Sequence, residues 1–386
     1  MIPPFEFATA HQIIFGTGVS IRLVELTRSL GRRAFVVLGS RHPTMTDLAN
    51  ELDKVGLLAA QSAVASEPTV PLILELTGQA KQAGADVIVA IGGGSALDAG
   101  KAVAAFLTNQ GDPLDYLEVV GKGLPLARPA APIIALPTTA GTGAEVTRNA
   151  VLAVPARQVK VSLRHASLLP RIALVDPLLT HSLPPAVTAS TGLDALTQCI
   201  EPFVSNMASP LTDAVAREGM RRAATALRRA VADGNDAAAR ADMALASLCG
   251  GLALANAKLG AVHGFAGVLG GIAPIPHGVV CARLLPVVFA ANVQVLQDNH
   301  DPDGYLPRFD EVARILTGNL RAVAADGVEW ISALCTDLHI PGLRTFGIHP
   351  DQFDAIIAKS QTSSSMKGNP VRLSNDQLAA ILHQAS

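Results

Sequence analysis

The sequence predicts an α/β domain with a parallel sheet, followed by an all-α domain. Short β-rich runs alternate with helical patterns up to about residue 183, and strand-like runs become rare after it. Two consecutive prolines, Pro184 and Pro185, mark the change and suit a hinge and a helix start. We therefore expect domains at residues 1–183 and 184–386.

Four continuous apolar runs predict the strands of the sheet. Helical patterns at residues 45–55 and 70–83 separate the first run from the second. Apolar strands without alternation are typical of a parallel sheet covered on both faces, which binds ligands at the carboxyl ends of its strands. The runs are residues 33–40 (RAFVVLGS), 86–94 (DVIVAIGGG), 132–139 (PIIALPTT) and 172–177 (IALVDP).

Ala- and Leu-rich helical stretches predict the second domain. Residues 299–304 (NHDPDG) interrupt them and read as a turn-rich surface loop. The predicted helices are residues 209–232, 237–257, 307–326, 327–338 and 374–385.

Composition narrows the class of protein. Of 386 residues, 49% are hydrophobic and 16% charged, which indicates a well-buried globular chain. The formal net charge of −2 offers no basic excess for nucleic acid or an anionic membrane. No stretch reaches about 18 uninterrupted apolar residues, so no membrane span is predicted, and the N-terminus lacks the pattern of a signal peptide. Four widely spaced cysteines without a CxxC pair suggest buried free thiols and a cytoplasmic location.

A glycine-rich loop follows the second predicted strand. Residues 91–101 read IGGGSALDAGK. Gly92, Gly93 and Gly94 let backbone N–H groups approach an anion at a helix N-terminus. Ser95 and Asp98 have the spacing of a reciprocal helix cap. The pattern fits a cofactor phosphate site, although a simple strand–helix turn would look the same.

A second polar loop follows the next predicted strand. Residues 136–147 read LPTTAGTGAEVT. The hydroxyls of Thr138, Thr139 and Thr142 could hydrogen-bond a cofactor, whereas ordinary turn chemistry also favours Thr and Gly. Two such loops at successive strand ends favour a ligand.

The second domain contains candidate metal ligands. Asp194 and Gln198 are four residues apart and share a helix face. His263 and His277 lie in apolar, glycine-rich surroundings. A carboxylate and two imidazoles suit Zn²⁺ or Fe²⁺ and leave positions for a substrate oxygen. Hydrogen-bonded core histidines are the alternative interpretation.

Taken together, these motifs resemble the iron-containing (group III) alcohol dehydrogenases over nearly the whole chain. That family has an N-terminal dinucleotide-binding, Rossmann-like α/β domain and an all-helical C-terminal domain, an architecture shared with dehydroquinate synthase. The matching segments are residues 13–18 (IIFGTG), 92–98 (GGGSALD), 137–147 (PTTAGTGAEVT), 175–183 (VDPLLTHSL), 191–201, 262–277 and 365–370 (SMKGNP).

The resemblance implies a metal-assisted NAD(P)-dependent alcohol dehydrogenase, or aldehyde or ketone reductase, that is a homodimer. Hydride would pass between nicotinamide C4 and a small alcohol or carbonyl whose oxygen a metal polarises. His277 and Lys160 are the expected catalytic residues. The implied metal ligands are Asp194, Gln198, His263 and His277, and the implied cofactor residues are Gly92, Gly93, Gly94, Ser95, Asp98, Thr138, Thr139, Thr142 and Lys160.

The sequence departs from the family pattern at two positions. The family usually has His where this chain has Gln198, and an amide oxygen binds Zn²⁺ or Fe²⁺ more weakly than imidazole. The family also usually has a second His where this chain has Gly267, and that His is thought to relay protons. Water or another group would have to replace it, and His165, His181 and Tyr305 are candidates.

The segment after the first predicted strand bears on cofactor choice. Members that prefer NAD resemble one another in an acidic residue there. This chain has Gly39, Ser40 and Arg41 instead, and Ser40 and Arg41 could bind a 2′-phosphate. We expect NADP, or use of both cofactors, in preference to NAD alone.

Two related families give alternative functions. A maleylacetate reductase shares the fold and is thought to need no metal. A dehydroquinate synthase-like lyase would need more Lys, Arg and His residues in the helical half than this chain has. Phe203, Phe265 and Val268 predict a modest apolar substrate pocket.

Overall fold

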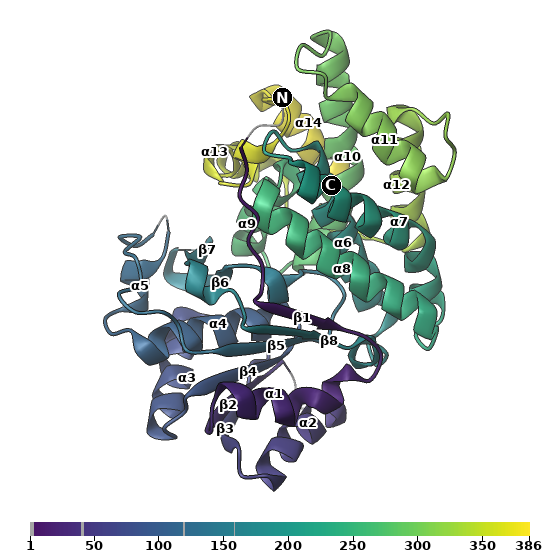
Figure 1. The fold of residues 1–386 in the computed structure, drawn as a ribbon. Helices are drawn as coiled ribbons and strands as arrows, with labels where there is room; N and C mark the ends of the chain where they lie inside the picture. Colours follow the sequence, from purple (N-terminus) through teal and green to yellow (C-terminus); the bar gives the residue numbers. More distant parts are fainter. Residues whose placement is uncertain (1–3, 40–41, 119, 158) are drawn as a thin grey trace. The chain divides into compact units, whose positions relative to one another are not determined.

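The computed structural model describes residues 4–39, 42–118, 120–157 and 159–386. Its contacts divide the chain into two compact units (Figure 1). The sheet unit comprises residues 9–139 and 143–182, and the helical unit comprises residues 4–8, 140–142 and 183–386, within the part described. One of the predicted cofactor loops therefore contributes residues to both units.

The sheet unit is built on a six-stranded sheet in the order β1-β8-β5-β4-β2-β3. Every neighbouring pair in it is parallel, as the continuous apolar runs predict. Carboxyl ends of neighbouring parallel strands meet at one edge, which brings the loops that follow them together. The strands are β1 (Gln12–Phe15), β2 (Ala34–Leu38), β3 (Leu58–Ala63), β4 (Val87–Gly92), β5 (Ile133–Pro137) and β8 (Ile172–Val175).

Helices cover both faces of this sheet. Because side chains alternate along a strand, Val36 faces one cluster and Phe35 and Val37 face the other. The first cluster includes buried leucines of α1 (Leu23–Leu30) and α2 (Pro43–Lys54), and the second includes those of α3 (Val70–Gln82) and apolar residues of α4 (Gly94–Thr108). The predicted doubly covered parallel sheet is confirmed.

Several elements of this unit have no predicted counterpart in the sequence. The short β1 and the edge strand β3 were not predicted, nor was a separate antiparallel pair, β6 with β7. Helix α1 also went unpredicted. Further elements are η1 (Val19–Arg22), α5 (Pro113–Tyr116), η2 (Ala144–Val146), β6 (Asn149–Val154), η3 (Pro155–Arg157), β7 (Val159–Arg164), η4 (Ala166–Leu168) and η5 (Pro177–Thr180).

Helix α6 (Pro185–Val204) is the centre of the helical unit. It packs against α7, α8 and α10 and is buried along most of its length. Pro185 occupies its first turn, where a missing N–H costs nothing. The other helices are α7 (Pro210–Ala232), α8 (Ala237–Ala257), α9 (Ala261–Ile272), α10 (His277–Asp298), α11 (Leu306–Thr317), α12 (Ala324–Asp337), η6 (Leu343–Phe346), η7 (Pro350–Gln352), α13 (Phe353–Thr362), η8 (Met366–Gly368) and α14 (Asn375–Ala385).

One predicted helix of this unit is wrong in its length. The structure divides residues 307–326 between α11, which ends at Thr317, and α12, which begins at Ala324. Gly318 ends α11 in the left-handed conformation, with φ of 70°, as glycine commonly does after a helix. The turn predicted at residues 299–304 is present, with positive φ at His300, Asp301 and Gly304.

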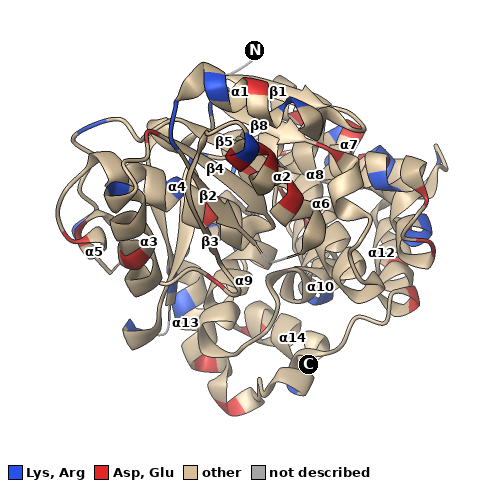
Figure 2. Cartoon of the chain, turned by 90° about the horizontal axis from the view of Figure 1, so that it is seen from below, with Lys and Arg blue, Asp and Glu red and all other residues tan. Residues whose placement is uncertain are grey.

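Helices α8 and α10 are the two long helices with the most apolar sequences among the described residues. By length and composition alone, α8 and α10 could cross a membrane, but 61% and 67% of their apolar windows are buried inside the protein. Such burial is usual for helices at the centre of a globular fold. Acidic and basic residues are interspersed along the chain, in keeping with the net charge of −2 (Figure 2).

Candidate metal centre and cofactor loops

Helix α6 supplies two buried polar side chains to the candidate metal centre. Asp194 and Gln198 lie one helical turn apart. The exposed fraction of Asp194 is 2% and that of Gln198 is 3%. Asp194 Oδ1 and Gln198 Oε1 have no hydrogen-bond partner. A buried oxygen without a donor is costly, so both atoms fit a site that a cation completes.

Two histidines from α9 and α10 meet Asp194. His263 Nε2 lies 3.3 Å from Asp194 Oδ1 without forming a hydrogen bond, and His277 Nε2 lies 3.8 Å from the same oxygen. The two imidazole rings are tilted, with centroids 5.4 Å apart. The structure therefore brings together Asp194, His263 and His277 from distant parts of the sequence.

Glu201 holds His263 from behind. Its Oε2 lies 2.7 Å from His263 Nδ1, and its Oε1 accepts a hydrogen bond of 2.7 Å from the Val262 N–H. A carboxylate can only accept, so His263 Nδ1 must carry the proton. His263 Nε2 is then left with a lone pair directed at the cluster, the arrangement that metal-binding histidines usually have.

A polar network fixes the start of α9, which carries His263. Gly260 has no side chain to cap this helix, and Asn369 Oδ1 accepts a hydrogen bond of 3.2 Å from Ala261 N instead. Asn292 and Asn369 hydrogen-bond each other through both amides. Asn369 belongs to the SMKGNP segment, so this motif has a structural role at the candidate metal centre.

The same segment packs too closely to tolerate a side chain at its glycine. A Cβ atom on Gly368 would lie 2.1 Å from the carbonyl oxygen of Leu259. Asn206 Nδ2 donates to the carbonyl oxygens of Lys367 and Asn369 at 3.0 and 3.3 Å. Residues 365–370 are thus held firmly against the loop that precedes α9.

The cluster favours positive charge at its centre. Burial raises the pKa of Asp194, but His277 and His263 outweigh it and hold the pKa of this carboxyl below its ordinary value. Burial lowers the pKa of His263, but Cys281, Asp194 and Glu201 raise it well above 6.5. Burial also lowers the pKa of His277, while Cys281 and Asp194 raise it to about 9. A cation of either kind, a proton or a metal ion, is stabilised here.

Sequence reasoning missed Cys281 as a member of this cluster. All four cysteines are buried and free, as predicted. Cys281, however, lies one turn after His277 on α10, and one potential ligand atom from each of Asp194, His263, His277 and Cys281 lies within 4.8 Å of the others. The His-x-x-x-Cys spacing was the available signal. These donors and the unpaired oxygens fit a divalent transition metal.

The glycine loop lies at the carboxyl edge of the sheet. Gly92 ends β4 and packs backbone to backbone against Gly39, which follows β2, since a Cβ on Gly92 would lie 2.8 Å from Gly39 Cα. Thr138 N donates to Gly92 O at 2.9 Å, and Thr139 lies beside Gly93. The two predicted loops are therefore neighbours, and these glycines are needed for close approach.

The predicted reciprocal cap of the helix after this loop is wrong. Helix α4 begins at Gly94 and has no side-chain cap, so Ser95 already lies inside its first turn. Asp98 Oδ2 instead accepts a hydrogen bond of 3.1 Å from Val151 N, and Oδ1 lies 3.7 Å from Lys101 Nζ. The open amino end of α4, with its unpaired N–H groups, suits an anion.

The remaining predicted cofactor residues have varied surroundings. Lys160 on β7 forms an ion pair of 3.0 Å with Glu67 Oε1. Thr142 belongs to the helical unit, whereas Thr138 and Thr139 belong to the sheet unit. Ser40 and Arg41 lie outside the described residues.

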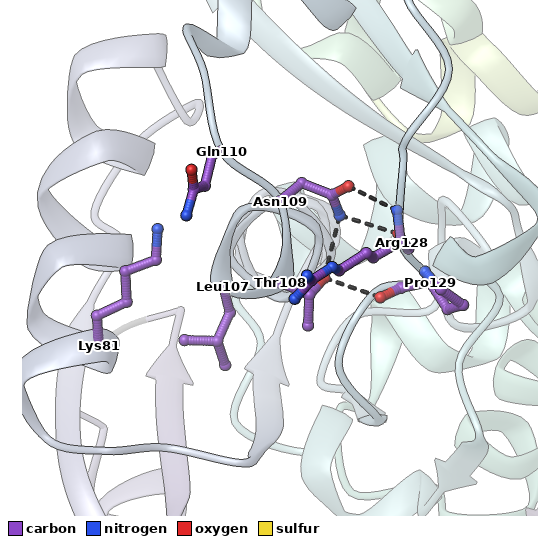
Figure 3. Close-up of a pocket in the computed structure, with 7 residues that line it drawn as sticks. All are labelled: Lys81, Leu107, Thr108, Asn109, Gln110, Arg128 and Pro129. Atoms are coloured by element: carbon purple, nitrogen blue, oxygen red, sulfur yellow. Dashed lines mark hydrogen bonds between the residues drawn. The ribbon is translucent and has the colours of Figure 1, made fainter.

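An open pocket in the sheet unit lies away from these motifs. Its volume is about 530 Å³, and it is lined by residues near the carboxyl end of α4, including Asn109, with Lys81 and Arg128 (Figure 3). Asn109 hydrogen-bonds the backbone of Arg128 through both its oxygen and its nitrogen. Because the glycine loop lies at the amino end of α4, this pocket is at the opposite edge of the sheet from the expected ligand edge.

The aromatic residues expected to line a substrate pocket are core residues instead. Phe203 and Phe265 are fully buried in the main cluster of the helical unit. The guanidinium groups of Arg308 and Arg217 lie 4.4 and 5.0 Å from the ring centroid of Phe203. Val268 is only partly buried and stays a candidate.

The candidate proton-relay residues differ in their surroundings. His165 Nδ1 accepts a hydrogen bond of 3.2 Å from Ser167 N and so caps a short helix. His181 Nε2 is buried without a hydrogen-bond partner, but His181 belongs to the sheet unit. Tyr305 precedes α11 in the helical unit. The position of Gly267 is open, since a Cβ there would meet nothing within 4 Å.

Comparison with known families agrees with this geometry. Residues 10–177 match the family described as iron-containing alcohol dehydrogenase, and residues 188–386 match the C-terminal domain of the Fe-containing alcohol dehydrogenase family. The chain belongs to the iron-containing alcohol dehydrogenase family. It is an oxidoreductase acting on CH–OH donors, as predicted, and the family implies NAD(P) and a divalent metal, iron, as cofactors.

Individual relatives of this family member are similar over most of their length. Alcohol dehydrogenase 4 of Saccharomyces cerevisiae is 36% identical over 307 residues, covering 79% of this chain and 77% of the relative. The 1,3-propanediol dehydrogenase of Klebsiella pneumoniae is 37% identical over 306 residues, covering 78% and 76%. A crystal structure of 1,3-propanediol oxidoreductase superposes with a TM-score of 0.91 at 32% identity, covering 100% of both chains. The predicted fold class is confirmed.

Proposed function

We propose that Asp194, His263 and His277 hold the divalent metal of this alcohol dehydrogenase, with Gln198 as a weak additional donor. The observation that carries this proposal is the unpaired Asp194 Oδ1, which faces the nitrogens of both histidines. When His263 is neutral with its proton on Nδ1, its Nε2 and Asp194 Oδ1 are two acceptor atoms 3.3 Å apart, and a second proton on His263 or a metal ion would remove the repulsion between them.

When bound there, a divalent metal supplies Lewis-acid polarisation of a substrate oxygen, and the nicotinamide exchanges hydride with the substrate carbon. Glu201 keeps the lone pair of His263 directed at the cluster, and Asp194 contributes a negative charge. The side chain of His277 is 33% exposed, whereas those of Asp194 and His263 are almost fully buried. A small alcohol or carbonyl would therefore approach from the side of His277.

The sheet unit would bind the dinucleotide at the carboxyl edge of its sheet. Gly92, Gly93, Gly94 and Ser95 would hold the pyrophosphate at the amino end of α4, next to Gly39. Thr138 and Thr139 would donate hydroxyl hydrogen bonds to the cofactor, and the same role for Thr142 stays a prediction from the sequence. Asp98 would support the helix through its hydrogen bond from Val151 N, and Lys160 would reach the cofactor by leaving its ion pair with Glu67.

We propose NADP, or both cofactors, as the redox partner. Support comes from the sequence at Ser40 and Arg41, which offers a hydroxyl and a guanidinium and no carboxylate to repel a 2′-phosphate. A sulfoacetaldehyde reductase from Bifidobacterium kashiwanohense, 28% identical with a TM-score of 0.87, was solved with NAD⁺. The ratio of kcat/KM for NADPH to that for NADH decides between the two.

The substrate class follows the relatives. They are dehydrogenases of alcohols and diols, which favours a small alcohol or aldehyde over the substrate of a maleylacetate reductase. Fe²⁺ and Zn²⁺ both suit the imidazole and carboxylate donors. The homodimer and the cytoplasmic location stay predictions, and sedimentation analysis measures the first.

Replacement of one ligand tests the metal centre. His277→Ala should lower the metal content measured by elemental analysis and the NAD(P)H-dependent reduction of small aldehydes together. His349→Ala, an exposed histidine of the same unit, is the matched control and should change neither. Full activity of metal-stripped wild-type protein would contradict the proposal.

A further inference from the structure

Cys281 occupies an unusual place among the four buried cysteines. Its Sγ lies 3.6 Å from the Nε2 atoms of both His263 and His277. Cys335, in contrast, donates to the carbonyl oxygen of Ala282 at 3.2 Å, and Cys199 Sγ lies 3.6 Å from that of Ala246. Burial raises the pKa of Cys335 to about 12 and that of Cys199 well above 9.0, so both stay ordinary thiols.

Hydrogen bonding leaves one atom beside Cys281 unsatisfied. The thiol can donate to Nε2 of His263 and accept from Nε2 of His277, both 3.6 Å from Sγ, but neither bond supplies a donor to Asp194 Oδ1. The proton of His263 is already committed to Glu201 through Nδ1, and Asp194 Oδ1 has no donor. One cation among these four atoms would satisfy all of them at once.

The separations also match those of a tetrahedral metal site. With typical Zn–S and Zn–N bond lengths and a tetrahedral angle, sulfur and nitrogen ligands lie about 3.6 Å apart. Both Sγ–Nε2 distances are 3.6 Å, and the distance between His263 Nε2 and Asp194 Oδ1 is 3.3 Å. These three separations are those of ligands on one tetrahedral ion, whereas His277 Nε2 lies 3.8 Å from Asp194 Oδ1, so binding would draw the four atoms, all within 4.8 Å of one another, slightly closer together.

Charge balance points to the same ligand. Asp194 and a thiolate at Cys281 together carry two negative charges, which neutralise a divalent ion in a buried site. Gln198 is uncharged and leaves the balance incomplete if it takes the fourth position. Gln198 Oε1 nevertheless remains unpaired and near-fully buried, so it stays available as a weaker donor.

We propose that Cys281 is a thiolate ligand of the metal centre, together with Asp194, His263 and His277, and that it makes the centre select Zn²⁺ over Fe²⁺. Binding moves the thiol proton to solvent and forms the metal–sulfur bond, with no change of oxidation state. Thiolate is a soft ligand that suits zinc, whereas nitrogen and oxygen donors alone discriminate less. This inference rests on the metal centre of the proposed function and names the ligand that replaces the imidazole missing at Gln198.

The test compares metal binding by wild-type protein and the variant Cys281→Ser. Apoprotein prepared with a chelator is titrated with Zn²⁺ and Fe²⁺ against a competing chromophoric chelator, and with Co²⁺ followed by absorption. Wild-type protein should show a sulfur-to-cobalt charge-transfer band in the near ultraviolet. Cys281→Ser should lose that band and about 100-fold or more in zinc affinity, because even residues behind the ligands cost about 10–100-fold.

Two further variants make the result specific. Cys249→Ser, a buried cysteine on α8 outside the cluster, should behave as wild type. Gln198→His in the Cys281→Ser background should recover zinc affinity without recovering the band, since an imidazole then replaces the thiolate. The preference for Zn²⁺ over Fe²⁺ should fall in Cys281→Ser relative to wild type.

X-ray absorption on zinc-loaded wild-type protein needs no variant and covers the case in which Cys281→Ser does not fold. One sulfur neighbour at the zinc supports the inference, and nitrogen and oxygen neighbours alone overturn it. Metal binding by wild-type protein without a charge-transfer band overturns this inference and leaves the proposed function intact. A wild-type protein that binds no metal overturns both.

Discussion

Replacing Glu201 with glutamine should disable His263 as a ligand while leaving its ring in place. Glu201 accepts two hydrogen bonds of 2.7 Å, from Val262 N and from His263 Nδ1, and is only 4% exposed. A glutamine has one oxygen and can accept from only one of the two. If the oxygen faces Val262 N, its amide N–H₂ faces Nδ1, and the proton of His263 must move to Nε2.

The size of the effect follows from these contacts. The free energy of unfolding of metal-free Glu201→Gln should change little, because the glutamine amide donates to Nδ1 in place of the original bond and the proton on Nε2 can be donated to Asp194 Oδ1. A proton on Nε2 blocks the lone pair that would bind the metal. Zinc affinity should therefore fall about 10–100-fold, or about 1.4–2.8 kcal/mol.

Two measurements check this prediction. Chemical denaturation of the apoprotein gives the unfolding free energy, and competition titration gives the zinc affinity. Glu329→Gln makes the same charge change at an exposed site on α12 and should alter neither. Wild-type zinc affinity in Glu201→Gln would refute the assignment of the Nδ1 proton and of Glu201 as the positioning residue.

Two further predictions concern the sheet unit. Burial raises the pKa of Glu145 from 4.5 to about 7, so the folded state keeps this proton longer and loses stability as pH rises from 4.5 to about 7. Glu145→Gln should be more stable than wild type by up to about 3 kcal/mol above pH 7 and equally stable below pH 4.5. Urea unfolding measures both free energies, and a difference between the two proteins that does not change with pH would contradict the prediction. Gly92→Ala places a Cβ 2.6 Å from that of Ala96 and should cost about 1–3 kcal/mol. Gly78→Ala on the exposed face of α3 is the control: its Cβ would contact no other atom, and the free energy of unfolding should rise by about 0.5–1 kcal/mol. Equal melting temperatures for the two alanine variants would contradict the close packing of Gly92.

The parts of the fold that could be predicted are those with a strong local pattern. The strands β2, β4 and β5 are buried on every residue, so the sequence shows them as unbroken apolar runs. Strand β3 (LAAQSA) is only half-buried at the sheet edge and has no β-branched residue, which leaves no comparable signal. The stop at Gly318 was missed because a single glycine inside a helical pattern is also tolerated.

In the candidate metal centre, too, some residues could be predicted from a local sequence pattern and others could not. The pairing of Asp194 with Gln198 follows from helix periodicity alone, and both histidines were notable for their apolar surroundings. Cys281 was hidden because buried cysteines are common, although it follows His277 at helical spacing. The hydrogen bond from His263 to Glu201 joins residues 62 positions apart, and no local pattern predicts such a pair.

The packing of residues 365–370 against the loop before α9, called the clamp below, has a consequence for biosynthesis. Helix α9, with His263, depends for its first turn on Asn369, which lies more than 100 residues later in the chain. A nascent chain emerges from the ribosome in order, so the helices that carry Asp194 and His277 are available well before this clamp is synthesised. Maturation of the centre is therefore coupled to the synthesis of residues 365–370, because a chain stalled before residue 365 would expose a ligand set whose helix α9 lacks its support.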